Sequence, residues 1–297
     1  MDNSADFDLN ELSTEELAAL KSDLSDQLRC YFRHIVGLAG AYEHIQQGGI
    51  RKPQKPFYYS AAVIEVCNNW YLLTAGHNVR GMEAAATRQD MKLVACGLDD
   101  TYAPLSQHKG PIPVFDFQGA HRFYQDTEGL DFGLIHIRPH YRDLLKANGI
   151  QPLTEHYWNP NEVDACDKFL MVGFPERSIY SGVTFSPEYY RAEVKGAPSV
   201  ILIDRLLDTP TDLPSTRYPR FIGQIRAEHD VGSIVGMSGG PIFCFKGHDF
   251  EPYYVAATQS TWIEQRKITF GCPLPVIIET ARKFLTQCAM GCATSTS

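Results

Sequence analysis

The sequence predicts a mainly β protein, a sandwich or a barrel, with one helix near each end. Between His34 and Cys272, short runs rich in Val, Ile, Tyr and Phe alternate with Gly, Pro, Asn and Asp. Many short strands separated by turn residues are typical of sandwiches and barrels. Outside this region, apolar residues recur at the three- and four-residue steps of amphipathic helices. The length of 297 residues suits one large domain or two modest ones.

The composition of the first dozen residues predicts disorder, and a helix is expected from Ser13 toward Ile35. Ser13 and Glu16 form a capping box, in which each side chain satisfies a free backbone N–H at the helix start. The apolar stripe of this helix consists of Leu17, Leu20, Leu24, Leu28, Tyr31 and Ile35. It packs on the domain's own surface or docks a regulatory partner, and the sequence leaves both alternatives open.

The expected strands follow in order along the chain. Segments with the strand pattern include 35–42, 60–66, 70–76, 92–98, 132–137, 168–174, 220–228, 241–245 and 253–259. The Asn68-Asn69 pair predicts a hairpin turn, because Asn tolerates a positive φ. The polar, Pro-rich segment 204–219 predicts a long surface loop. A C-terminal helix is expected over about 275–288, followed by a flexible tail at 289–297.

Charge and composition exclude several classes of partner. The net charge of −8 argues against nucleic-acid and anionic-membrane binding. The acidic N-terminus lacks a signal-peptide pattern, and no apolar run approaches the ~20 residues of a membrane span. The eight cysteines are scattered and are expected to be reduced thiols, which predicts a cytoplasmic protein. We expect no cofactor and no metal, since Cys288 and Cys292 lack a second pair and His136 and His140 are typical surface residues.

One candidate nucleophile stands in the segment "GMSGGP", residues 236–241. The hydroxyl of Ser238 needs a base within hydrogen-bond reach, and that base needs a third group to orient it. His77 is the candidate base, because it follows an apolar run and a small-residue turn. Asp131 is the candidate acid, because it directly precedes an alternating apolar strand. In α/β-hydrolases the order is Ser, acid, His, whereas only His248 follows Ser238, so the order excludes that fold.

Together, Thr-Ala-Gly-His, Asp-x-Gly-Leu-Ile and Gly-x-Ser-Gly-Gly-Pro resemble the motifs of the chymotrypsin (trypsin-like) serine proteases, most closely bacterial and HtrA-type members. The similarity covers roughly residues 34–290. The segment 169–175 is similar to the strand that opens the second barrel in HtrA-type enzymes, and Asp230 stands where those enzymes often carry an Asp.

The resemblance implies two six-stranded antiparallel β-barrels with the site between them. The first barrel would span about 34–160 and the second about 161–272, after an N-terminal region at 1–33. It implies a serine endopeptidase in which His77 is the base, Asp131 orients His77, and Ser238 is the nucleophile. The backbone N–H groups of Gly236 and Ser238 would form the oxyanion hole. The substrate would be a protein or peptide.

Departures from the family pattern predict which side chains the specificity pocket accepts, and they predict that activity is not controlled by insertion of a new N-terminus. Asn78 replaces the disulfide-bonded cysteine of secreted members, and Met237 replaces the Asp that pairs with a newly cleaved N-terminus in digestive members. Gly232, with Ser233 after it, stands at the base of the expected specificity pocket, whose wall would include Ala256, Ala257 and Thr258. This pocket is expected to take small or apolar side chains. Two alternatives remain: a proteolytically silent domain that binds a peptide or partner, and an esterase with the same triad.

Overall fold

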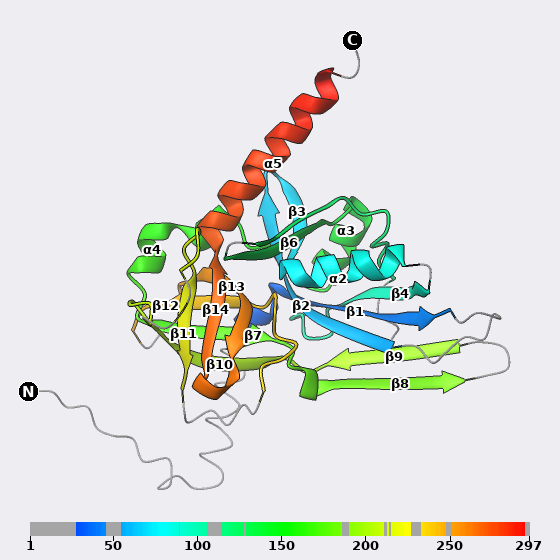
Figure 1. Ribbon diagram of the computed structural model, residues 1–297, viewed down its shortest axis with the longest axis horizontal. Coiled ribbons are helices and arrows are strands. Elements are labelled where there is room, and N and C mark those ends of the chain that lie inside the picture. Colours follow the sequence, from blue (N-terminus) through cyan, green and yellow to red (C-terminus); the bar gives the residue numbers. More distant parts are fainter. Residues whose placement is uncertain are drawn as a thin grey trace, which may run out of the picture.

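The computed structural model describes residues 28–45, 55–88, 90–105, 114–127, 129–185, 190–210, 213, 215–226, 233–247 and 251–294. Two β units lie side by side, and a long C-terminal helix projects from the body (Figure 1). The fold is mainly β with helices at its ends, as expected.

The first unit is a six-stranded antiparallel sheet in the order β4-β1-β2-β3-β6-β5. Its strands are β1 (Ile35–His44), β2 (Lys55–Val66), β3 (Asn69–Thr74), β4 (Met91–Asp99), β5 (Arg122–Thr127) and β6 (Leu130–His136), with helices α2 (Gly76–Thr87) and α3 (Pro139–Ala147). Among the described residues the end strands β4 and β5 do not pair, so this unit is a half-barrel; with the closed barrel of the second unit it gives the expected two-barrel architecture.

The second unit is a closed six-stranded barrel in the order β10-β11-β14-β13-β12-β7. Its strands are β7 (Lys168–Gly173), β10 (Ser199–Arg205), β11 (Phe221–Ile225), β12 (Pro241–Phe245), β13 (Tyr253–Ile263) and β14 (Ile268–Pro273). Between β7 and β10 the chain forms a separate hairpin of β8 (Ile179–Phe185) and β9 (Tyr190–Gly196), and β9 contacts β1 and β2 of the first sheet. The chain also forms the short helices η2 (Glu155–Trp158), α4 (Pro160–Asp164), η3 (Glu176–Ser178) and η4 (Glu264–Arg266).

A shared hydrophobic core joins the two units. Phe132 of β6, Val172 of β7 and Phe243 of β12 are all fully buried in one cluster, which also contains Ile277 of helix α5 (Leu274–Thr294). Burial of a large apolar side chain stabilises the folded state by about 1.5–3 kcal/mol. This common core therefore holds the first sheet and the barrel in one arrangement.

Two local predictions need correction. The β2–β3 turn is centred on Cys67 and Asn68, with φ of 50° and 60°, one residue earlier than predicted, and Asn69 already begins β3. A two-residue hairpin turn of this type needs a positive φ at both central residues. Helix α5 starts at Leu274 and runs to Thr294, beyond the predicted end at 288.

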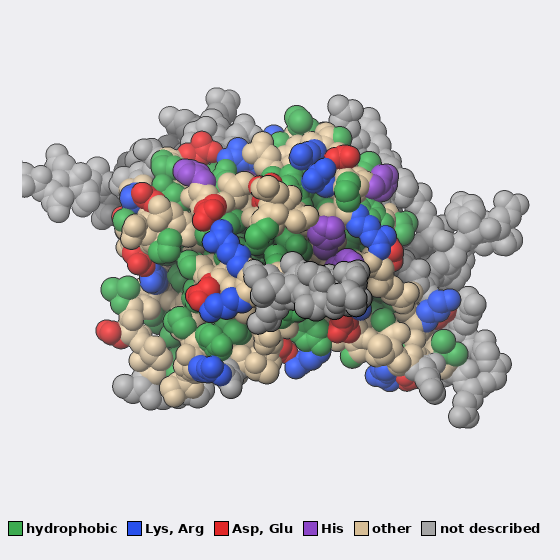
Figure 2. Space-filling model, turned by 90° about the horizontal axis from the view of Figure 1, so that it is seen from above, with side chains coloured by type: hydrophobic (Ala, Val, Ile, Leu, Met, Phe, Trp, Pro, Cys, Tyr) green, Lys and Arg blue, Asp and Glu red, His purple; other side chains and the backbone are tan. Residues whose placement is uncertain are grey.

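The predicted N-terminal helix lies largely outside the described residues, of which 28–32 are helical. The long loop predicted at 204–219 lies between β10 and β11, apart from its first two residues, which end β10. None of the described helices combines the length and the apolar character that a membrane crossing would need. Figure 2 shows acidic and basic side chains interspersed over one face of the molecule.

Candidate active site

His77 stands where strand β3 passes into helix α2. The strand ends at Thr74, Ala75 adopts an extended conformation, and His77 is the second residue of the helix. A Cβ on the preceding Gly76 would lie 2.1 Å from the carbonyl oxygen of Gln125, so only glycine allows this approach. The rigid strand end thus holds the imidazole at the surface of a cleft with a side-chain exposure of 34%.

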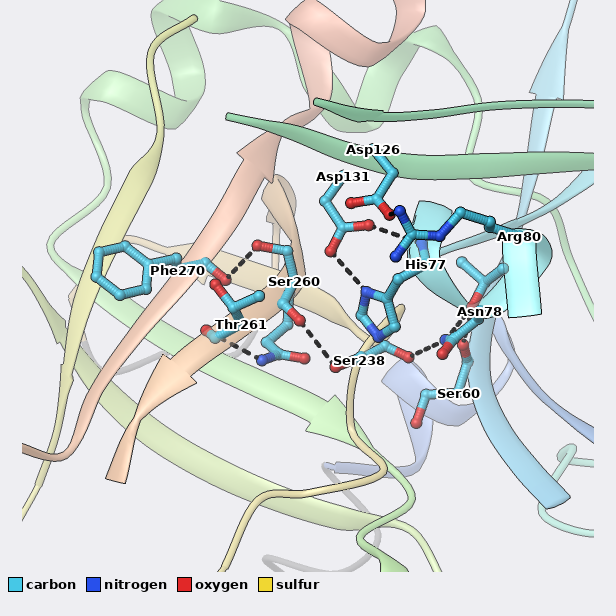
Figure 3. Close-up of polar contacts among 12 residues, drawn as sticks. Ser60, His77, Asn78, Arg80, Asp126, Asp131, Ser238, Ser260, Thr261 and Phe270 are labelled. Atoms are coloured by element: carbon cyan, nitrogen blue, oxygen red, sulfur yellow. Dashed lines mark hydrogen bonds and ion pairs between the residues drawn. The ribbon is translucent and has the colours of Figure 1, made fainter. Parts of the chain in front are cut away.

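Asp131 is the second residue of β6 and contacts His77 at two points. Its Oδ2 accepts a hydrogen bond from the Nδ1 of His77 at 2.8 Å, and its Oδ1 accepts one from the His77 backbone N–H at 3.0 Å (Figure 3). The carboxylate is buried. Because an ionised carboxylate only accepts hydrogen bonds, Nδ1 carries the proton and Nε2 is left to exchange one in the neutral ring.

The pKa of His77 is set by opposing effects. Burial is the largest and would lower the pKa, but the hydrogen bond and negative charge of Asp131, with a further contribution from Asp126, raise it above the usual 6.5. Arg80 lowers it slightly and forms an ion pair with Asp126, in which Nη1 lies 2.6 Å from Oδ2. A carboxylate partner therefore stabilises the imidazolium form of this half-buried ring.

Residues 236–240, which we call the nucleophile turn, connect to β12 and carry Ser238. Gly236 and Gly239 have φ of +93° and +96°, a region that disfavours L side chains. A Cβ on Gly239 would lie 2.2 Å from the Oγ1 of Thr74 and 2.3 Å from the carbonyl oxygen of Ser60. The turn is therefore pressed directly against β2 and β3 of the first sheet.

The hydroxyl of Ser238 is engaged with the barrel in this structure. Its Oγ donates a hydrogen bond to the carbonyl oxygen of Ser260 on β13 at 2.8 Å. Ser238 has one hydroxyl proton, so it does not donate to His77 in this arrangement. Both side chains nevertheless line the same cleft, and Figure 3 shows the His77 ring beside Ser238. In unliganded sites, catalytic hydrogen bonds are often long or unmade.

The two peptides that flank Gly236 are each held by one hydrogen bond. The carbonyl oxygen of Val235 accepts from the N–H of Glu176 at 2.7 Å, and that of Gly236 accepts from the Oγ of Ser60 at 3.0 Å. In a trans peptide the N–H points opposite to the carbonyl, so the Gly236 N–H faces away from Glu176. Neither this N–H nor that of Ser238 has an acceptor among the described residues.

A cleft of about 960 Å³ contains these groups. Residues from both units line it: Pro56, Phe57, Tyr58, Tyr59, His77, Asn78, Arg80, Asp126 and Asp131 from the first, and Glu176, Ile179, Ile234, Val235, Gly236, Ser238, Ser260, Thr261 and Trp262 from the rest of the chain. The three candidate triad residues and both candidate oxyanion donors are thus on one cleft.

The residues predicted to form the specificity pocket lie elsewhere. Ala256, Ala257 and Thr258 are buried within the barrel and do not line the cleft. Ser233 is half-buried outside the lining, and Gly232 is outside the described residues. On β13 the cleft wall is formed by Ser260, Thr261 and Trp262, a few residues further along the strand. The predicted strand run stopped at 259, so the sequence pattern missed this wall.

Comparisons with known proteins add fold similarity only. No protein-family model and no curated protein matches this chain. Among solved structures, a Glu endopeptidase is 11% identical with a TM-score of 0.43, over 87% of this chain and 93% of the other. A thermostable serine protease from an extremophilic microorganism is 13% identical with a TM-score of 0.40, over 79% and 90%. A catalytically active tobacco etch virus protease is 11% identical with a TM-score of 0.38, over 84% and 76%. These values are too low to assign an activity or substrate to this chain.

Proposed function

We propose that this chain is a serine endopeptidase of the chymotrypsin-like class, with Ser238 as nucleophile, His77 as base and Asp131 as orienting acid. The observation that carries the proposal is the two-point contact between Asp131 and His77 on the cleft that also holds Ser238. An imidazole oriented in this way, beside a serine on a glycine-shaped turn, is the arrangement that nucleophilic acyl transfer needs.

The reaction follows from these positions. Rotation about the Cα–Cβ bond of Ser238 exchanges the Ser260 carbonyl for His77 Nε2 as the acceptor of the hydroxyl proton. The Oγ then attacks the substrate carbonyl carbon while His77 takes the proton. The C–N bond breaks as His77 gives that proton to the leaving amine, and a water molecule hydrolyses the acyl-enzyme by the same route in a second half-reaction.

The oxyanion of the tetrahedral intermediate would be stabilised by the backbone N–H groups of Gly236 and Ser238. Both lack an acceptor among the described residues, the peptide that contains the first is held by Glu176, and the next peptide is held by Ser60. A donor of this kind contributes about 3 kcal/mol of transition-state stabilisation. The Glu176 contact supports the proposed direction of the Gly236 N–H.

A free strand edge supports a peptide substrate over a small ester. Strand β13 pairs with β12 only as far as Thr258, and Gln259 bonds to the nucleophile turn. From Ser260 onward, β13 pairs only with β14 among the described strands. An exposed strand edge that lines a cleft can accept an extended peptide as an added strand. The proposed substrate is therefore an extended protein segment.

The proposed cleavage preference is for small or apolar side chains. On the barrel side of the cleft that contains Ser238, Val235 and Trp262 present apolar surface. We expect a panel of peptides that differ only at the residue before the cleaved bond to show the highest kcat/KM for small or apolar residues. A strong preference for Arg or Lys at this position would contradict the proposal.

Labelling by a serine-directed fluorophosphonate tests the proposed nucleophile directly. The probe should form an O–P bond with Ser238 and release fluoride, because the same base and donors act on phosphorus as on carbon. Mass spectrometry should find the adduct on the peptide that contains Ser238, and the His77→Ala variant should react far more slowly. Absence of labelling in the folded wild type would contradict an active site of this kind.

A proteolytically silent binding domain is the second candidate, and one observation favours it. The hydroxyl of Ser238 donates to Ser260 rather than to His77, so the structure has the serine in a non-attacking rotamer. If this state persists with substrate, the cleft and the β13 edge would bind an extended peptide without cleaving it. Stoichiometric peptide binding without labelling or turnover would support this second function.

A further inference from the structure

We infer that Ser60 and Asn78, two side chains of the first sheet unit, are positioning residues that hold the nucleophile turn in its working shape. The inference rests on the proposed function, because it concerns the turn that carries Ser238. Neither residue is required to touch the substrate. Each is bonded to the carbonyl oxygen of a residue whose N–H is a proposed oxyanion donor.

Asn78 links the base to the nucleophile. It directly follows His77 in α2 and its side chain is 4% exposed. Its Nδ2 donates to the carbonyl oxygen of Ser238 at 3.0 Å and to the Oγ1 of Thr74 at 3.1 Å. The residue next to the proposed base is therefore hydrogen-bonded to the backbone of the proposed nucleophile, which lies 160 positions away in the sequence.

Ser60 links the same sheet to the first oxyanion donor. It is fully buried in β2, and its Oγ donates to the carbonyl oxygen of Gly236 at 3.0 Å while accepting the backbone N–H of Phe174 at 2.8 Å. The proton and an acceptor site of this hydroxyl are thus both in use. Ser60 connects β2, the exit of β7 and the nucleophile turn at a single atom.

Thr74 joins the two positioning residues into one network. Its Oγ1 donates to the carbonyl oxygen of Ser60 at 2.8 Å, so its proton is committed and it acts as acceptor toward Asn78. Both partners of the Asn78 Nδ2 are therefore acceptors, which determines the orientation of the amide. A side chain without donors at position 78 would therefore remove the hydrogen bonds to the Ser238 carbonyl oxygen and to the Thr74 Oγ1.

The network matters because the nucleophile turn is rich in glycine and has few constraints of its own. Gly236 has no side chain and a φ of +93°, so a change in its backbone torsions would turn its N–H away from the substrate oxygen. Misplacement of a reacting group by about 1 Å can cost ~10²-fold in rate. Loss of either hydrogen bond should therefore lower kcat more than it changes KM.

The test compares Ser60→Ala and Asn78→Leu with Asn148→Leu as a matched control. Asn148 also donates through Nδ2 to a buried acceptor, Asp100 Oδ2 at 2.7 Å, but lies outside the cleft. We expect the first two variants to lose about 10- to 100-fold in kcat and in fluorophosphonate labelling rate, with KM within about threefold of wild type. The control should lose thermal stability without a change in either rate.

Hydrogen exchange provides a readout that does not depend on activity. Amides in peptides covering 234–240 should exchange faster in both variants than in wild type. In Asn148→Leu their exchange rates should equal those of wild type. If Asn78→Leu does not fold, Asn78→Asp replaces it in the test, because the aspartate keeps the shape of the side chain but removes its N–H donors. Folded variants with wild-type labelling rate, kcat and exchange would overturn the inference. A wild type without labelling would contradict the proposed function, while hydrogen exchange would still decide whether the two residues hold the turn.

Discussion

Replacement of Ser238 by alanine is expected to lower kcat by about 10⁶-fold, because no other group can form the acyl-enzyme. Fluorophosphonate labelling should disappear in the same variant. The fold should be retained, since among the described residues the side-chain hydrogen bond removed is the one to the Ser260 carbonyl. A hydrogen bond of this kind contributes about 1 kcal/mol to stability. Initial rates on a fluorogenic peptide and thermal unfolding measure the two effects separately.

A matched control for this substitution is Ser199→Ala on β10, which is half-buried and does not line the cleft. It should leave both turnover and labelling unchanged. Turnover by folded Ser238→Ala at more than about a hundredth of the wild-type rate would show that another group or a contaminating enzyme performs the reaction. That result would remove the assignment of Ser238 as nucleophile.

Substitution of Asp131 by asparagine should lower kcat at neutral pH by about 10⁴-fold with little change in cleft geometry. The amide cannot stabilise an imidazolium, and it favours the wrong tautomer of His77. The pKa of His77 should also fall, because Asp131 is the main group that raises it against the lowering effect of burial. NMR titration of the His77 ring in both proteins measures this change. A His77 pKa that stays above 6.5 in Asp131→Asn would contradict the assigned role.

The same pKa determines the sign of two pH effects in the wild type. Activity should be lost as the pH falls through the raised pKa, because protonated His77 cannot accept a proton from Ser238. Stability behaves in the opposite way. The folded pKa lies above the unfolded value of about 6.5, so His77 contributes stability that is fully present below pH 6.5 and is lost as the pH rises through the folded pKa.

The triad candidates could be chosen from sequence because each lies in a recognisable local context. His77 follows a strand-like run, Asp131 begins one, and Ser238 stands among glycines, and these patterns depend only on neighbouring residues. The structure places all three on one cleft. Gly239 illustrates the limit of such reasoning. Its φ of +96° is typical of a glycine turn, but its contact with Thr74 and Ser60 belongs to the packing of two units.

The β13 side of the cleft and the proposed positioning network could not be found in the same way. The family resemblance placed the pocket wall at Ala256 to Thr258, whereas the cleft is lined by Ser260 to Trp262. Strand β12 stops pairing with β13 at Thr258, and the part of β13 beyond that point reaches the cleft. Nothing in the sequence near Ser60 indicates that its hydroxyl would meet Gly236, 176 positions away.

The sequence by itself therefore determined the strand-rich class, the chain order of the proposed base, acid and nucleophile, and the need for glycine around Ser238. Tertiary structure decided that the first sheet stays open, that Ser238 donates to Ser260, and that Asn78 and Ser60 hold the nucleophile turn. The physical reason is the distance along the sequence over which each kind of interaction acts. Strand periodicity and turn propensity act over a few neighbouring residues, whereas these hydrogen bonds join segments that meet only when the shared core packs the two units together.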